Sequence, residues 1–451
     1  MLFQALWFFF TIKSTKQQIN KTTTMKTNLY LLVFLTLLFN CKEDKQTITN
    51  AKDYNVFLNA KNKKLENANA ENKFWVDKQN KTPHPFSYFA QIASAQNQLF
   101  DATGNIENLV LAEDYLVKLN ESTKHENAGQ LRALARNYIS QHRFKESLAL
   151  LEKAEVIGDD IESTQKMLFD VHMELGNYDT AKSYLEKVVD LTGFDYLIRT
   201  AKWNDHIGNL DAAIKYMEKA MAKAESSNLK GVKQWSYTNI ADFYGHDGQI
   251  QKSYDYFLKA LALDPNDAYA KKGIAWIVYS HERNPKEALR ILNTVTENYA
   301  APDYFLLKAE ISEFIKDEIS KNNYIEHYNK AVQKTKYGEM YNAYNAKLYA
   351  ENSKLVDSAI AISNREIENR ATPQSYALLA WSYFNKGENN KALDIVNKHV
   401  INKTFEPETL YHIAEIYKAN GMIKELKPLK DELLGATYEL GPVMEIKINQ
   451  L

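Results

Sequence analysis

The residues of this chain that could do chemistry are few and scattered. Ten histidines lie along the sequence, and none stands three or four residues from another, the spacing at which two side chains on one helix face can share a metal ion. His125-Glu126 and His281-Glu282 begin like the HExxH zinc motif, but no second histidine follows. The phosphate-binding P-loop, the dinucleotide motif GxGxxG and the nucleophile motif GxSxG are also absent from the sequence. We therefore expect no catalytic residue, no bound metal and no cofactor.

The only cysteine, Cys41, carries the one clear chemical signal. A single thiol excludes an internal disulfide and a cysteine-based zinc site. Cys41 follows eleven mostly apolar residues, Leu29 to Phe39. As a helix they would span about 17 Å, whereas the hydrocarbon core of a bilayer is roughly 30 Å thick. A run of this length is typical of the apolar part of a signal peptide.

This segment resembles the signal of bacterial lipoproteins, in which the cysteine sulfur is acylated and the chain is cut before it. Leu38 stands where those signals carry leucine, whereas Phe39 and Asn40 depart from the small residues usual there. The resemblance implies a signal peptide over 25–40 and lipidation at Cys41. The alternative is a free cysteine beside an uncleaved signal anchor.

The resemblance also implies a place for the protein, on the outer membrane in the cell envelope. Lys42-Glu43-Asp44 is similar to a short tether that some lineages use for export to the cell surface, so the periplasmic and surface faces both stay open. We interpret residues 1–24 as an upstream extension before a start at Met25. The alternative is that their apolar run is a membrane segment.

The rest of the chain is organised by a repeat. A small residue and an aromatic residue recur three positions apart, at Ala135/Tyr138, Ala241/Tyr244, Ala346/Tyr349, Ala380/Tyr383 and Ala414/Tyr417. Successive alanines are separated by 106, 105, 34 and 34 residues, which is one period of 34 or about three of them. A fixed period of this size is typical of a solenoid of stacked helical units.

Glycine marks the turn inside each unit, seven residues after the small position, as at Gly208, Gly248, Gly387 and Gly421. Glycine adopts the left-handed backbone conformation that ends one helix and lets the chain reverse into the next. The Gly245-His246-Asp247-Gly248 segment falls in such a turn, so we interpret its histidine–aspartate pair as structural.

The unit resembles the tetratricopeptide repeat, a helix-turn-helix of 34 residues, most clearly over 232–265. The resemblance implies an all-α, right-handed solenoid of about nine to ten repeats over residues 83–434. We expect a flexible tether over 41–50, an N-terminal capping helix region over 51–82 and a C-terminal tail over 435–451. In the looser units the turn glycine is replaced or a residue is inserted.

Charge and fold together limit the classes of partner. The chain has 56 basic and 57 acidic residues and a net charge of −1, which gives no electrostatic case for nucleic acid. Tetratricopeptide repeats bind ligands through exposed positions of the first helix of each unit. We therefore expect a protein or peptide partner in a concave groove and, besides the lipid on Cys41, no small-molecule cofactor.

Two sets of residues fall on those positions. The N-terminal half offers the cations Arg132, Arg136, Lys166 and Lys202, which suit a carboxylate or an acidic peptide. The carboxylate clamp of the family needs asparagines where Asp170 and Asp205 stand, so a faithful clamp is not expected. The alternative for these cations is a solvated helix face with ion pairs.

The C-terminal half offers the aromatic residues Trp381, Phe384 and Tyr411 as candidate anchors for a peptide or a sugar. The alternative is that Trp381 and Phe384 pack against the neighbouring helix.

These observations favour one function over two others. The leading hypothesis is a lipid-anchored, extracytoplasmic and monomeric scaffold that binds a protein or peptide, within an envelope assembly or secretion complex. The second is a glycan-binding lipoprotein that works with an outer-membrane transporter, although such proteins carry long loops between helices. The third is a regulator associated with a separate enzyme.

Overall fold

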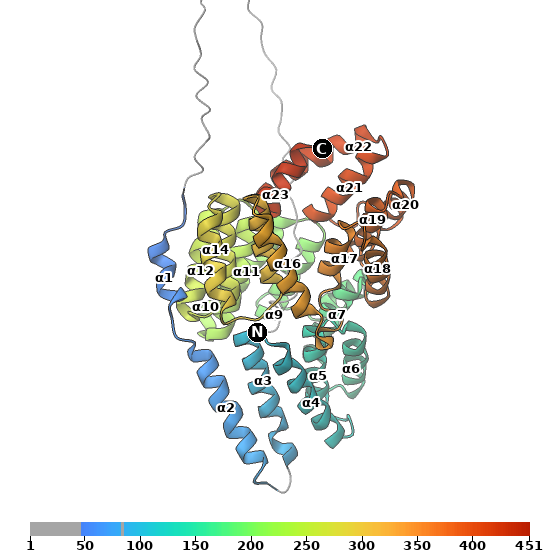
Figure 1. Cartoon of the computed structure of the whole chain (residues 1–451). Coiled ribbons are helices and arrows are strands. Elements are labelled where there is room, and N and C mark those ends of the chain that lie inside the picture. The colour runs from blue at the N-terminus through green and yellow to red at the C-terminus, as the bar shows by residue number, and fades with distance from the viewer. Residues whose placement is uncertain (1–46, 83–84) are drawn as a thin grey trace, which may run out of the picture.

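The computed structural model describes residues 47–82 and 85–451, and every regular element in these ranges is a helix (Figure 1). The upstream extension, the signal peptide and Cys41 lie outside the described residues. Helices α1 (Ala51–Leu58) and α2 (Lys63–Gln79) come first, and the short helix η1 (Pro85–Tyr88) leads into the repeats.

Ten pairs of helices follow, and we number them as repeats 1 to 10. In order, they are α3 (Phe89–Thr103) and α4 (Ile106–Ser122), α5 (Ala128–Ser140) and α6 (Phe144–Ile157), α7 (Ile161–Leu175) and α8 (Tyr178–Lys187), α9 (Phe194–His206) and α10 (Leu210–Ser227), α11 (Lys230–His246) and α12 (Ile250–Leu263), α13 (Ala268–Trp276) and α14 (Pro285–Thr296), α15 (Asp303–Phe314) and α16 (Glu318–Val332), α17 (Asn342–Ala350) and α18 (Val356–Asn369), α19 (Pro373–Asn385) and α20 (Asn389–Ile395), and α21 (Pro407–Ala419) and α22 (Ile423–Gly435).

The remaining elements are short or terminal. The π-helical turns η2 (Ile277–His281) and η4 (Val396–Val400) extend α13 and α20, and η3 (Thr335–Tyr337) lies between repeats 7 and 8. The expected C-terminal tail forms one more helix, α23 (Thr437–Asn449). The all-α solenoid is thus confirmed.

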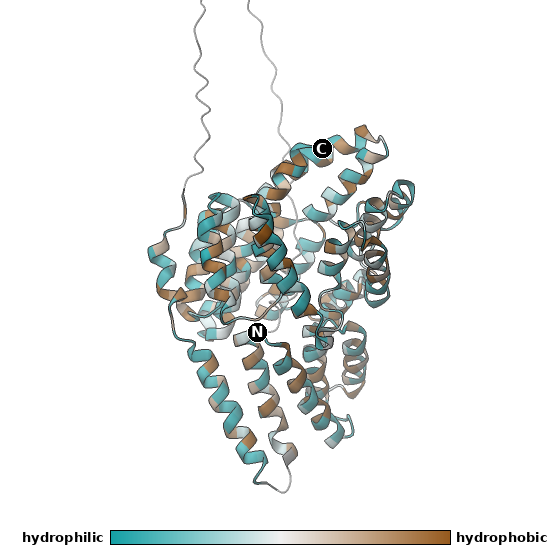
Figure 2. Cartoon of the chain, in the orientation of Figure 1, coloured by the Kyte–Doolittle hydropathy of each residue, from teal (hydrophilic) through white to brown (hydrophobic). Residues whose placement is uncertain are grey.

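The small residues of the repeat lie where helices approach most closely. Ala135, Ala241, Ala380 and Ala414 are fully buried, and Ala346 is nearly so. A larger side chain at these positions would push the helices apart. Figure 2 shows hydrophilic and hydrophobic residues alternating along the helices, as expected when each helix has one buried side.

Three looser repeats use another residue in place of the turn glycine. His142, Arg283 and Lys316 adopt the left-handed conformation in the turns of repeats 2, 6 and 7, with φ between 58° and 61°. The backbone shape of the turn is therefore kept although a side chain costs about 1–2 kcal/mol there. This explains why the motif fades in these units while the fold does not.

The first helices of the repeats form the inner layer of the stack. Helix α5 contacts α7, α7 contacts α9, and α17, α19 and α21 contact one another in the same way. Successive second helices do not approach each other to this extent in the described part of the chain. A stack of this kind curves toward the layer whose elements lie closer together, so the inner side belongs to the first helices.

The solenoid winds tightly enough for its second half to pack on its first half. We call the segment between the two helices of one repeat its turn, and the segment between two repeats a linker. The turn of repeat 1 meets the linker after repeat 6, where the Ala300 amide donates a 2.7 Å hydrogen bond to the Thr103 carbonyl. The turn of repeat 3 meets the linker after repeat 8, where a Cβ added to Gly176 would lie 3.0 Å from the Ala371 carbonyl oxygen. We call this line of contacts the seam.

The seam continues at the same offset of five repeats. The Phe405 ring, in the linker after repeat 9, covers Gly208 in the turn of repeat 4. Tyr438, after repeat 10, covers Gly245 at the turn of repeat 5, and its carbonyl accepts a 3.1 Å hydrogen bond from the Trp276 indole. Helix α23 thereby contacts α11, η2 and α15 as well as its neighbour α22.

The N-terminal helices do not act as one cap. Helix α2 packs on α3 and covers the first repeat, whereas α1 packs on α12 and α14 of repeats 5 and 6 (Figure 1). Residues Ile48, Thr49 and Asn50, which the sequence led us to expect within a flexible tether, form hydrogen bonds to these repeats. Contacts so distant along the chain leave no periodic signal, so the place of α1 could not be read from the sequence.

We predict that glycines on and off the seam differ in their tolerance of alanine. Gly176 and Gly387 both have positive φ, 80° and 87°, so alanine costs about 1–2 kcal/mol of backbone strain at either. At Gly176 the new Cβ also meets Ala371, whereas nothing lies within 4 Å at Gly387. Gly176→Ala should lower the free energy of unfolding in urea by about 1–3 kcal/mol more than Gly387→Ala. Equal losses would show that the seam adds no stability.

Candidate binding site on the inner helices

The four cations that sequence analysis selected lie on three successive inner helices (Figure 1). Arg132 and Arg136 are on α5, Lys166 is on α7 and Lys202 is on α9. The repeat places these helices side by side and brings the four side chains onto one face. Three of the four are already paired with carboxylates of the chain itself.

Arg132 is used to hold the next repeat. Its Nη1 donates hydrogen bonds to the Asp159 carbonyl at 2.7 Å and to Thr164 Oγ1 at 3.0 Å. Its Nη2 lies 3.2 Å from Asp160 Oδ2. Because the guanidinium group of Arg132 already bonds to the linker between repeats 2 and 3, this residue acts chiefly in joining the two repeats.

The two lysines are paired in a similar way. Lys166 Nζ lies 2.7 Å from Glu162 Oε1 and 3.4 Å from Asp195 Oδ2. Lys202 Nζ lies 2.9 Å from Glu174 Oε1, and the other oxygen of Glu174 lies 3.4 Å from Arg370 across the seam. Most of the expected cationic strip is therefore neutralised by carboxylates of the chain. This agrees with the alternative interpretation, in which these cations form ion pairs on a solvated helix face.

A buried ion pair that the sequence did not reveal lies among these residues. Arg199 Nη2 donates a 2.6 Å hydrogen bond to Asp170 Oδ2, and both side chains are almost fully buried. Burial raises the pKa of Asp170, and the neighbouring charges of Arg199 and Lys202 oppose that shift. Asp170 thus serves as the partner of an arginine on the next repeat rather than as part of a ligand clamp.

Arg136 differs from the other three. Its side chain is exposed, and no carboxylate pairs with it in the described part of the chain. The side-chain hydrogen bond of Arg136 is a weak one, from Nη2 to Met167 Sδ at 3.9 Å. The pKa of Arg136 is lowered, first because the surrounding protein removes part of its water and second because the charges of Arg199 and Arg132 repel it. An anion placed here would relieve that repulsion and could accept two parallel N–H groups.

The aromatic candidates lie in the core rather than on the surface. Trp381 and Tyr411 are buried, and Phe384 is half-buried. The Trp381 ring stacks on Phe384 at 5.0 Å and on His412 at 4.2 Å between ring centroids. These residues join repeats 9 and 10, so the packing alternative describes them and an exposed anchor does not.

A second aromatic group went unnoticed in the sequence. Tyr328, Tyr337 and Tyr344 surround Tyr341, with ring centroids 5.1 to 6.0 Å away. Tyr337 also packs against Ile106 of repeat 1 across the seam. The sequence does show one sign of this group, because eight tyrosines fall between residues 299 and 349. The group is structural.

The histidine of the Gly245-to-Gly248 turn also belongs to the seam. His246 Nδ1 lies 3.2 Å from Glu439 Oε2 of α23, and burial lowers the pKa of His246 to about 4. Burial likewise raises the pKa of Glu439 well above its usual value. Both shifts have one cause, the removal of the two side chains from water, and both favour the uncharged form of each group.

Over 47–82 and 85–451, no group of three or more histidine, aspartate or glutamate side chains is arranged to hold a metal ion. None of the helices in these ranges is long and apolar enough to cross a bilayer.

Comparison with known proteins identifies the repeat. The family model for the tetratricopeptide repeat matches residues 170–194 and 236–267, which lie mainly in the second helix of repeat 3 and in repeat 5. No curated protein matches the chain.

Several solved structures share the type of fold. The human IFIT1 dimer with PPP-AAAA is 19% identical, with 72% of this chain and 75% of that chain covered and a TM-score of 0.43. PilF of Pseudomonas aeruginosa is 15% identical, covering 47% and 95%, with a TM-score of 0.36. A tetratricopeptide repeat protein of Parabacteroides merdae is 16% identical, covering 57% and 97%, with a TM-score of 0.34. These likenesses carry no information on what this chain binds.

We predict that two arginines of this face differ sharply in their effect on stability. Arg199→Leu leaves Asp170 buried without its partner and should lower the free energy of unfolding by about 3–5 kcal/mol. Arg136→Leu removes an exposed, unpaired cation and should change it by less than about 0.5 kcal/mol. Urea denaturation followed by circular dichroism measures both. The double variant Asp170→Leu/Arg199→Leu should recover part of the loss, and a loss equal to that of Arg199→Leu alone would contradict this account.

Proposed function

We propose that this chain, a tetratricopeptide-repeat protein, is a scaffold that holds a protein or peptide partner against the inner helices of repeats 2 to 4. Repeats of this type typically mediate protein–protein interaction, and the inner layer is formed by the helices that carry ligand contacts in such proteins. We further propose that the protein is monomeric and is anchored in the cell envelope by a lipid on Cys41.

The observation that supports this site is the contrast between Arg136 and its neighbours. Arg132, Lys166 and Lys202 are paired with carboxylates, while Arg136 is exposed and has none in the described residues. A partner that brings an aspartate, a glutamate or a terminal carboxylate to Arg136 would complete the pattern of alternating charge. The chemistry favoured is therefore an acidic peptide segment.

The other candidate functions have less support. A glycan-binding protein of the kind considered above needs long inserted loops. The two longest connections between the paired helices of repeats 1 to 10 are 333–341 and 396–406, and each includes a short helical turn. Nucleic acid is not favoured either, because the net charge is −1 and most inner cations are paired. The PPP-AAAA in the human IFIT1 structure belongs to that protein.

The lipid anchor is supported by the sequence around Cys41 alone. The apolar run before it has the length of a signal peptide, and it is the only cysteine of the chain. Mass spectrometry of the protein taken from membranes should find a mature N-terminus at residue 41 with acyl groups on it. An N-terminus upstream of residue 41, or an unmodified thiol, would contradict the anchor.

We predict that reversing the charge of Arg136 abolishes partner binding without affecting the fold. Full-length protein in mild detergent is immobilised and exposed to envelope extract, and bound proteins are identified by mass spectrometry. A partner retained by the wild type should be lost with Arg136→Glu and should elute as ionic strength rises, because exposed charges are screened. Lys230→Glu, a charge reversal at the exposed first residue of α11 in repeat 5, is the control. Undiminished capture by Arg136→Glu would contradict the site.

A further inference from the structure

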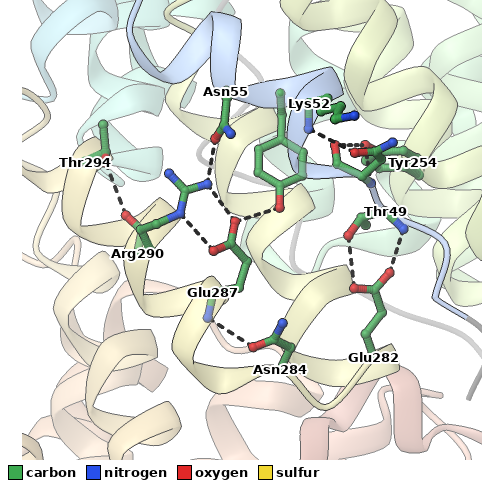
Figure 3. A network of polar contacts seen from close by, with 11 residues as sticks. Thr49, Lys52, Asn55, Tyr254, Glu282, Asn284, Glu287, Arg290 and Thr294 are labelled. Carbon is green, nitrogen blue, oxygen red and sulfur yellow. Dashed lines mark hydrogen bonds and ion pairs between the residues drawn. The ribbon is translucent and has the colours of Figure 1, made fainter. Parts of the chain in front are cut away.

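A short segment near the N-terminus is fastened to repeats 5 and 6, far from it in the sequence. We call residues 48–58 the strap. Figure 3 shows Glu282 and Glu287 of repeat 6 directed toward the strap, with Tyr254 of repeat 5 beside them. Every partner of the strap in this network is more than 200 residues away along the chain.

One carboxylate holds the start of the strap. Glu282 Oε1 accepts hydrogen bonds from the backbone amides of Ile48 and Thr49, at 2.8 and 2.6 Å. Its Oε2 accepts a third, at 3.0 Å, from the Thr49 hydroxyl. Three hydrogen bonds to one carboxylate fix the chain at a defined point. Glu282 lies in the turn between the two helices of repeat 6.

The helix of the strap is fixed by packing and by further hydrogen bonds. Tyr54 is buried in the core of repeats 5 and 6, and its hydroxyl donates a 2.7 Å hydrogen bond to Glu287 Oε1. Burial and this bond to Glu287 raise the pKa of Tyr54, so the phenol stays protonated. Arg290 Nη2 donates a 2.7 Å bond to Asn55, and the Asn50 amide donates one to Tyr254. The strap is therefore part of the folded body.

This position limits where the anchored end can be. Seven residue steps separate Cys41 from Ile48, and a chain extends at most about 3.6 Å per step, which gives roughly 25 Å. A lipid on Cys41 must then lie within about 25 Å of the repeat 6 turn. The next turn, of repeat 7, presents Ile315, Lys316 and Ile319 as exposed side chains.

The opposite edge of the solenoid is out of this reach. The linkers after repeats 2, 3 and 4 lie on the side away from the seam. Leu191 and Leu229 are exposed in these linkers, and Val156 is exposed in the last turn of α6 beside the first of them. A helix of 13 residues is about 20 Å long, and the seam stacks two layers of such helices, so the two edges are about 30–40 Å apart. A tether of roughly 25 Å cannot bring both edges to one membrane.

We infer that the strap sets the orientation of the protein on a lipid surface. The turns of repeats 6 and 7, with Ile315, Lys316 and Ile319, face the membrane, and the linker edge of repeats 2 to 4 faces away. Apolar side chains beside a lysine suit the boundary between lipid headgroups and acyl chains. This inference rests on the lipid anchor of the proposed function.

The test measures how close each edge lies to a membrane. Acylated full-length protein is purified from membranes and placed in vesicles of phosphatidylethanolamine and phosphatidylglycerol that contain an acceptor-labelled lipid. Because acylation blocks the Cys41 sulfur, a donor dye reacts only with a thiol introduced by Ile319→Cys or Leu191→Cys. Both positions are exposed, at 78% and 68%. Energy transfer should be several-fold stronger from position 319 than from position 191.

A strap variant and a mass measurement separate the possible failures. Glu282→Ala removes the three hydrogen bonds that start the strap, and the difference between the two positions should then shrink. Equal transfer from both positions in acylated protein, or stronger transfer from position 191, would overturn the orientation and leave the anchor intact. A Cys41 peptide without acyl groups would overturn the anchor and the orientation together.

Discussion

The close approach of turn and linker at the seam is the contact on which the rest of this structure depends. In most solenoids each repeat touches only its neighbours. Here the turns of repeats 1, 3, 4 and 5 meet segments five repeats later. Glycine lets the backbones approach at Gly104 and Gly176 and makes room for the Phe405 ring at Gly208. Pairs such as Glu174 and Arg370, 196 residues apart, thereby couple the two halves. The protein should unfold with more cooperativity than an open stack, since losing one repeat also removes contacts elsewhere.

The seam also determines which charges remain for a ligand. Residues that repeat periodicity places on the inner face are drawn into pairs once the helices are close together, as with Lys166 and Asp195 or Arg199 and Asp170. Removing charges from water is costly, and a close partner offsets that cost. Arg136 is the cation of the original four that this pairing leaves exposed without a carboxylate in the described chain. The candidate site is therefore the place on the inner face where a cation has no carboxylate partner within the described chain.

The sequence predicts those features that recur at the period of the repeat. Buried alanines such as Ala241, the turn glycines and the number of units follow from spacing, because each repeat solves the same local packing problem. The exposure of a side chain on the inner face does not follow from the spacing. The repeat pattern places Trp381 on that face, but whether the next helix covers it depends on the packing of the folded chain. Pairings such as Tyr54 with Glu287 cannot be read from one sequence, because they depend on how far the solenoid winds. The place of α1 on repeats 5 and 6 could not be predicted for that reason.

The two open edges of the solenoid have different characters, and this bears on how a partner reaches Arg136. The seam covers the turns of repeats 1, 3, 4 and 5, so the inner helices of repeats 2 to 4 are open on their linker side. That side exposes Val156, Leu191 and Leu229, which are among the most exposed large apolar residues of the described chain. Exposed apolar side chains on the same repeats as an unpaired arginine suit a peptide that carries both hydrophobic and acidic side chains. Under the proposed lipid anchor, the strap would hold the opposite edge toward the membrane and leave this side open to a partner.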